Sequence, residues 1–277
     1  MTDQKENCTH DCSTCGESEC QARGQIQKKK PHEGTSFQKI IAVISGKGGV
    51  GKSLVTSLLA VSLKNAGHSV ALLDADVTGP SAARAFGVDE MDATGDENGI
   101  FPVVTKGGIP LLGANNLLES PTTPIVWRGT LISNLVTQMF TDVCYGKKEV
   151  LLIDMPPGTG DVPLTVFQSL PIDGAIVVAT PQDLVNEVVA KSINMAKLMK
   201  VKLLGVVENM AYITCPHCGE KISVFGHNNG LLTESTGVPL LDELPIDPKL
   251  TKLIDEGKIE EYQGDYLSHA VDAILKA

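Results

Sequence analysis

The sequence predicts an α/β fold in which a mostly parallel central sheet is flanked by helices. Mainly apolar runs occupy residues 39–45, 69–76, 150–157, 174–181 and 202–210, as expected for strands buried on both faces. Helical patterns separate them, and a glycine-rich segment, GKGGVGKS at residues 46–53, stands between the first run and the helical pattern at 53–67. Because helices between successive strands imply βαβ units, the strands are expected to be parallel.

Length and charge narrow the class of protein. The 277 residues suffice for one large α/β domain with a sizeable core, or for two small domains. A formal net charge of −10 makes nucleic acid and anionic membranes poor partners, so neither is expected. No apolar run is long enough to span a bilayer, and the polar N-terminus lacks the apolar stretch of a signal peptide. We therefore expect a cytoplasmic protein.

The segment GKGGVGKS fits the phosphate-binding pattern G-x-x-x-x-G-K-[ST], in which a loop joins a strand to a helix. Backbone amides of such a loop converge on phosphate oxygens, and the positive end of the helix dipole adds to the attraction. Lys52 is expected to reach the β- and γ-phosphates of ATP, and Ser53 to ligate Mg²⁺. The pattern predicts a three-layer P-loop NTPase whose nucleotide-binding residues are Gly46, Lys47, Gly48, Gly49, Val50, Gly51, Lys52 and Ser53.

The chain is expected to divide into three segments. Residues 1–20 are polar and cysteine-rich, and residues 21–37, with a lysine triplet, proline and glycine, are typical of a flexible linker. Residues 38–277 are assigned to the P-loop ATPase domain, together with a C-x-x-C metal site. Within it, residues 92–130 are expected to form an irregular excursion that carries functional loops and one strand at 109–115.

Aspartates end two of the predicted strands, at the sheet edge where ligands bind in open α/β folds. Asp154 follows four apolar residues and is typical of a Walker B carboxylate that holds Mg²⁺ through water, although a strand-end aspartate in a turn is the alternative. Asp74 and Asp76 end the run at 69–76. Asp74 lies one residue nearer the strand and is expected to cap the loop.

The stretch KGGVGKS resembles the deviant P-loop of the MinD, Mrp and nitrogenase iron protein class of ATPases. The resemblance implies that Lys47 crosses a dimer interface to the partner's nucleotide; a solvent-exposed loop lysine is the alternative. It also implies that Asp76 is the first switch aspartate, which positions or polarises the attacking water. Asn209, which follows the strand-like run LLGVV, would contact the adenine, and a turn-forming asparagine is the competing interpretation.

Six of the seven cysteines fall in two clusters, as expected for metal ligands in a reducing compartment. Cys215 and Cys218 form a C-x-x-C after the predicted strand that carries Asn209. Two thiolates complete neither a tetrahedral zinc site nor the four-cysteine set of an iron–sulfur cluster. His217 or His227 can supply nitrogens to zinc, whereas a two-fold axis would double the pair and suit a bridging 4Fe–4S cluster. Cys144 stands alone and is interpreted as a small buried hydrophobe.

A deviant P-loop with C-P-x-C downstream resembles the Mrp/ApbC-type iron–sulfur cluster carrier ATPases over about residues 38–275. This resemblance implies a homodimer that binds ATP and Mg²⁺, hydrolyses ATP slowly, and transfers a bridging 4Fe–4S cluster to apo-proteins. The N-terminal cysteines resemble those of a subgroup with a ferredoxin-like cluster, although their spacing is shorter. They suit a second 4Fe–4S cluster or zinc, with Cys8, Cys12, Cys15 and Cys20 as ligands.

Three other functions compete with the cluster carrier. A MinD/ParA-type positioning ATPase would need a basic C-terminal helix or a basic patch, but the tail at 251–277 holds more acidic residues than lysines. An ATP-driven electron donor resembling the nitrogenase iron protein would use two separated cysteines in each chain. A structural zinc dimer with ATPase activity is the fourth hypothesis.

Overall fold

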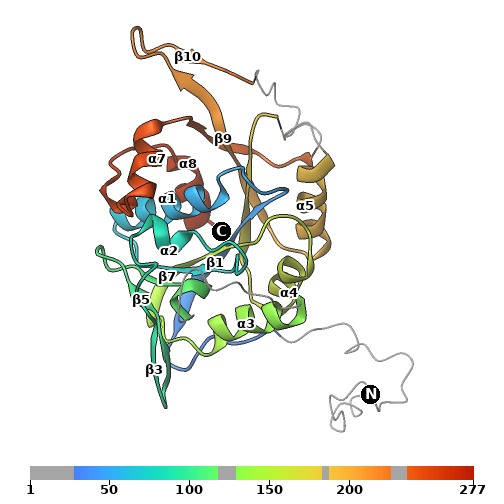
Figure 1. Ribbon diagram of the computed structural model, residues 1–277. Coiled ribbons are helices and arrows are strands. Elements are labelled where there is room, and N and C mark those ends of the chain that lie inside the picture. Colours follow the sequence, from blue (N-terminus) through green and yellow to red (C-terminus); the bar gives the residue numbers. More distant parts are fainter. Residues whose placement is uncertain (1–27, 118–128, 183–186, 226–235) are drawn as a thin grey trace, which may run out of the picture.

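The computed structural model describes residues 28–117, 129–182, 187–225 and 236–277 (Figure 1). The four N-terminal cysteines and His227 lie outside these residues. The described chain contains a nine-stranded sheet and a separate hairpin formed by β3 (Thr94–Asp96) and β4 (Gly99–Phe101).

The sheet is parallel except at its two ends. In spatial order its strands are β10 (Lys221–Ile222), β9 (Leu203–Thr214), β8 (Gly174–Ala179), β1 (Ser36–Ser45), β7 (Lys147–Asp154), β2 (Val70–Asp74), β6 (Pro110–Leu112) and β5 (Val103–Val104). β11 (Leu240–Pro245) also pairs with β9 in parallel, and only the β10–β9 and β5–β6 pairs are antiparallel. The predicted strand at 109–115 is β6, and the excursion around it holds short strands instead of only loops.

Helices cover both faces of the sheet because successive side chains of its central strand point to opposite sides. Ile40, Ala42 and Ile44 belong to one apolar core, and Ile41 and Val43 belong to the other. The first core is closed by α3 (Gly129–Thr141), α4 (Asp161–Ser169) and α5 (Glu187–Leu198). The second is closed by α1 (Lys52–Asn65), α2 (Ala82–Ala85), α7 (Pro248–Asp255) and α8 (Ser268–Leu275), with the 3₁₀ turn η3 (Ile259–Glu261). The predicted three-layer fold is confirmed.

The parallel register brings the predicted site residues to one edge of the sheet. Asp74 and Asp154 are the last residues of β2 and β7, and they pair directly across these strands. β1 lies on the other side of β7 and leads into the glycine-rich loop. The short turn η2 (Ala114–Leu117) follows β6 at this edge.

The N-terminal boundary of the domain lies earlier than the sequence indicates. β1 begins at Ser36, inside the segment assigned to a linker, and the Lys29 amide donates to the Ser169 carbonyl at 2.7 Å. Cys144 is only half-buried, and its Sγ lies 3.3 Å from His32 Nδ1, so its interpretation as a small buried hydrophobe is wrong. Residues 28–37 therefore contact the domain.

Two glycines allow a close contact between helix ends. Gly87 follows α2 and Gly257 follows α7, both with φ of +67°. A Cβ on Gly257 would lie 2.6 Å from the Gly87 Cα, which is closer than real contacts. Any side chain at position 257 would therefore force these two turns apart.

We expect Gly257→Ala to lower the free energy of unfolding by about 2–4 kcal/mol, because left-handed strain and overlap with backbone add together. Gly67→Ala is the matched control, since Gly67 has φ of +92° with open space around its Cα. It should cost only about 1 kcal/mol. Urea unfolding measures both, and equal losses would contradict the close contact.

Candidate functional site

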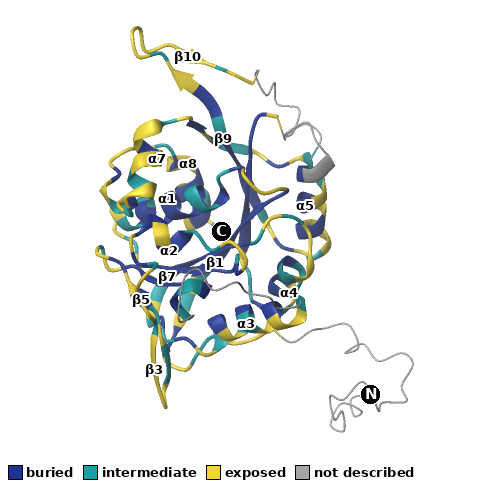
Figure 2. Cartoon of the chain, in the orientation of Figure 1, coloured by how far each residue is buried: buried dark blue, intermediate teal, exposed yellow. Residues whose placement is uncertain are grey.

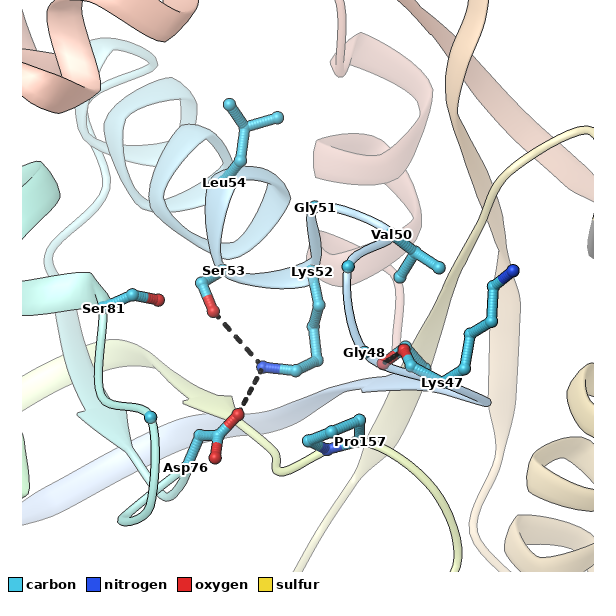
Figure 3. Close-up of a pocket in the computed structure, with 13 residues that line it drawn as sticks. Lys47, Gly48, Val50, Gly51, Lys52, Ser53, Leu54, Asp76, Ser81 and Pro157 are labelled. Atoms are coloured by element: carbon cyan, nitrogen blue, oxygen red, sulfur yellow. Dashed lines mark hydrogen bonds and ion pairs between the residues drawn. The ribbon is translucent and has the colours of Figure 1, made fainter.

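The glycine-rich loop between β1 and α1 forms the wall of a pocket of about 320 Å³ (Figure 3). Gly49 and Gly51 have φ of +81° and +79°, a left-handed conformation that favours glycine. Lys52, Ser53 and Asp76 also line this pocket. The predicted phosphate-binding segment thus surrounds one concave space.

Lys52 contacts carboxylates from two neighbouring strand ends. Its Nζ lies 2.6 Å from Asp154 Oδ1 and 4.0 Å from Asp76 Oδ2. Thr56 Oγ1 also donates to Asp154 Oδ1 at 2.9 Å. Asp154 is fully buried, yet its Oδ2 has no hydrogen-bond partner among the described residues. The Ser53 hydroxyl lies 3.4 Å from the same Lys52 Nζ, and a hydroxyl and a carboxylate are oxygen donors that suit a hard divalent cation such as Mg²⁺.

Asp74 closes the loop that carries Asp76. Its carboxylate accepts the amide protons of Asp76, Ser81 and Ala82, each at 3.0 Å. Burial first, and then the charge of Asp154, raise the pKa of Asp74 to about 7. Burial also raises the pKa of Asp76, against the opposing effect of Lys52.

Lys47 lies on the outside of the loop. Its side chain points away from the group formed by Lys52, Ser53 and Asp76 (Figure 3), and the residue is exposed. The two lysines of the motif are therefore separated: Lys52 belongs to the interior of this pocket and Lys47 to its surface.

Asn209 lies inside β9, a strand that extends four residues beyond the predicted run at 202–210. The strand continues to Thr214 because β11 and β10 pair with its second half. The Asn209 side chain is buried, and its Nδ2 donates to the Val50 carbonyl at 2.9 Å. Its position therefore ties β9 to the back of the phosphate loop.

Cys215 and Cys218 lie in the turn between β9 and β10, on a hairpin that extends beyond the rest of the domain (Figures 1 and 2). The Cys215 amide donates to the Glu220 carbonyl, and the Gly219 amide to the Cys215 carbonyl, both at 2.9 Å. Cys215 is half-buried and Cys218 is exposed. Backbone amides of Cys218 and then His217, followed by the Cys218 thiol, lower the pKa of Cys215, so the turn favours a thiolate.

The described residues offer no group of three or more histidine, cysteine or acidic side chains placed to hold a metal. The cysteine pair is thus an incomplete ligand set within this part of the chain. His217 contributes its amide, not its ring, to the sulfur environment that lowers the pKa of Cys215.

Exposed apolar side chains, which the sequence analysis missed, occur on both sides of the cysteine turn in the chain. Ile213 and Ile222 pair directly across the hairpin. They are 37% and 46% exposed, and Val224 and Phe225 beside them are 48% and 41% exposed. We call these four residues the hairpin apolar surface. The apolar side chains on both sides of the C-x-x-C were the available signal.

Residues 36–277 match the family described as NUBPL iron-transfer P-loop NTPase, within the ParA group. The chain belongs to this family. The NUBPL family consists of P-loop NTPases, and nucleotide hydrolysis is the general property of that class.

Relatives of known name agree with this membership. The chain is 46% identical over 235 residues to an iron-sulfur cluster carrier protein of Clostridium perfringens, covering 82% of each chain. It is 40% identical over 257 residues to a protein of the same name from Methanocaldococcus jannaschii, covering 90% of this chain and 89% of the relative.

Solved structures show the same fold. A nucleotide-binding protein from Archaeoglobus fulgidus, in complex with ADP, is 42% identical to this NUBPL-family chain. It superposes with a TM-score of 0.74, covering 84% of this chain and 94% of the other. The Aquifex aeolicus MinD in a MinC:MinD complex, 19% identical with a TM-score of 0.60 over 86% and 94% of the chains, shares the fold alone. No helix in the described part of the chain is long and apolar enough to cross a bilayer.

The raised pKa of Asp74 makes the stability of this NUBPL-family domain depend on pH. The folded protein holds the Asp74 proton up to about pH 7, whereas the unfolded chain releases it near the ordinary value of 3.8. Between these values the folded state binds more protons, so the free energy of unfolding falls as pH rises. In Asp74→Asn this fall should be shallower, as measured by urea unfolding at several pH values. Parallel pH profiles for the two proteins would show that Asp74 is not the source.

Proposed function

We propose that the protein is an ATP-dependent iron–sulfur cluster carrier that binds a 4Fe–4S cluster at a homodimer interface and transfers it to apo-proteins. The observation that carries this proposal is the exposed C-x-x-C turn on a P-loop domain, where backbone amides favour the thiolate of Cys215. The names of the relatives from Clostridium perfringens and Methanocaldococcus jannaschii support it.

The pocket would hold the phosphates of ATP. Residues 47–53 line it, so their amides would surround phosphate oxygens, and the Lys52 ammonium would contact the β- and γ-phosphates. Ser53 and Asp154 would hold Mg²⁺, which when bound neutralises charge on the phosphates. Asp76 lines the pocket and would orient the attacking water.

The homodimer is supported from both sites. The Lys47 side chain points away from Lys52, Ser53 and Asp76 of its own chain, and it would serve the nucleotide of a partner. The cysteine pair lacks further ligands among the described residues, and a two-fold axis would bring four thiolates together. The hairpin apolar surface belongs to the same hairpin as the cysteines, and the second chain would cover it.

The exposure of the cysteine turn suits a cargo instead of a permanent cofactor. A cluster held by thiolates at the tip of a hairpin is accessible to an acceptor protein, and thiolate ligands require a reducing compartment such as the cytoplasm. Cys8, Cys12, Cys15 and Cys20 would hold a second 4Fe–4S cluster or zinc; they lie outside the described residues.

Replacing both hairpin cysteines, in a Cys215→Ala/Cys218→Ala variant, should remove about four iron and four sulfide per dimer after anaerobic reconstitution. Activation of an apo-aconitase should fall to the rate without carrier. Cys144→Ala is the matched control, since this thiol lies beside His32 and away from the hairpin, and should transfer normally. Undiminished transfer by the double variant would refute the carrier site.

The same reconstitution separates the alternative functions. Zinc instead of iron in the anaerobically purified protein would favour the structural zinc dimer. A reversible one-electron couple without cluster transfer would favour the electron donor.

Replacing the two lysines of the loop should affect nucleotide affinity differently. Lys52→Ala should weaken nucleotide binding and lower ATP hydrolysis by about 100-fold or more, because the phosphates lose their buried cation. Lys47→Ala should lower hydrolysis similarly but keep nucleotide affinity, because it would act on the partner's nucleotide. Lys249→Ala, just after the N-cap of α7, is the control. Calorimetric binding with a phosphate-release assay separates the cases, and full hydrolysis by Lys47→Ala would exclude the crossing lysine.

A further inference from the structure

The strand that holds the phosphate loop also carries the cysteines. Asn209 donates to the Val50 carbonyl from the middle of β9, and Cys215 follows the end of that strand six residues later. The contact between strand and loop is tight, because a Cβ on Gly51 would overlap Asn209 Nδ2. Any displacement of the loop at this point therefore acts on β9.

Asn209 also sets the direction of an amide in the phosphate pocket. The Val50 carbonyl and the Gly51 amide belong to one planar trans peptide, so they point in opposite directions. With the carbonyl held by Asn209, the Gly51 amide is turned away from β9, and Gly51 lines the pocket. A phosphate that binds this amide pulls on the same peptide plane that Asn209 holds.

The next residues of β9 form an irregular hinge. Met210 has φ of +59°, a strained conformation for a residue with a side chain. Pairing with β11 shifts here as well: Glu243 faces Glu208 and Pro245 faces Tyr212, so two steps along β11 match four along β9. Such a bulge changes the direction of a strand locally.

Beyond the hinge, contacts continue to the cysteine turn. The Ile246 amide donates to the Tyr212 carbonyl at 2.8 Å, and Lys221 Nζ lies 4.2 Å from the centre of the Tyr212 ring. Ile213 pairs with Ile222, and the Cys215 amide bonds to Glu220. A change at the hinge is thus transmitted to the hydrogen bonds that position the Cys215 sulfur.

We propose that Asn209 is a positioning residue that couples nucleotide binding at the Val50–Gly51 peptide to the geometry of the Cys215–Cys218 turn. The coupling is reciprocal, so a cluster on the cysteines changes the affinity for nucleotide by the same factor. The regulation of a cluster rests on the proposed function, in which the cysteines bind that cluster. The coupling between nucleotide and the cysteine turn requires no cluster.

Thiol alkylation of the full chain, read peptide by peptide, tests the coupling. Trypsin releases both hairpin cysteines in residues 203–221 and Cys144 in residues 129–147, which serves as an internal reference. Saturating Mg²⁺–ADP or a non-hydrolysable ATP analogue should change the alkylation rate of the hairpin cysteines by about fivefold or more. In Asn209→Ala, nucleotide should leave that rate unchanged, with saturation verified by calorimetry.

Asn116→Ala is the matched control. Asn116 is also buried and donates to the carbonyls of Val88 and Met91 at 2.8 Å, away from β9. It should keep the wild-type response. The inference is overturned if Asn209→Ala keeps the response, or if Asn116→Ala loses it too.

Hydrogen exchange of the wild-type chain needs no variant. Nucleotide should alter the exchange rates of the amides of Ala211–Thr214, and unchanged rates there would overturn the coupling even if Asn209→Ala fails to fold. Failure of this proposal and failure of the proposed function can be told apart. If nucleotide changes the hairpin but the protein transfers no cluster, the carrier function is refuted and the coupling stands.

Discussion

The contact between the Lys52 ammonium and the Asp154 carboxylate organises the phosphate pocket. Both groups are almost completely buried, where an unpaired charge is strongly destabilising, so the pair holds the start of α1 against the end of β7. Asp74 and Asp76 add negative charge beside the same lysine. Burial first, and then the charge of Asp154, raise the pKa of Asp74, and a divalent cation would offset the negative charge of this group.

The features that the sequence predicts correctly are those that short sequence patterns determine. The strands, the glycine-rich loop and the aspartates at strand ends follow from short patterns, because parallel strands bring their carboxyl ends to one edge. The continuation of β9 beyond residue 210 was missed because its partners β10 and β11 define it, and the strand's own residues do not reveal them. The contact between Cys144 and His32 likewise joins residues more than 100 positions apart, and no local pattern encodes it.

β9 serves two regions of the protein with different requirements. Its first half is buried among parallel neighbours and provides a rigid support for the phosphate loop. Beyond Met210, Ala211 and Tyr212 are still buried and Tyr212 pairs with β11, whereas Ile213 and Thr214 are exposed and pair with the two residues of β10. The positive φ of Met210 marks the boundary between the two parts of the strand. Support of the phosphate loop and exposure of the cysteine turn are thus achieved within a single strand.

The shortness of β10 has a consequence for solubility. An exposed strand at the edge of a sheet is a template for uncontrolled pairing with other chains, especially where apolar side chains accompany it. Among the described residues, the edge strand β10 has two residues, and one of them is Lys221, a charged residue of the type that opposes edge-to-edge aggregation. A protomer can therefore present Ile213 and Ile222 to solvent while offering little backbone for fibril-like growth.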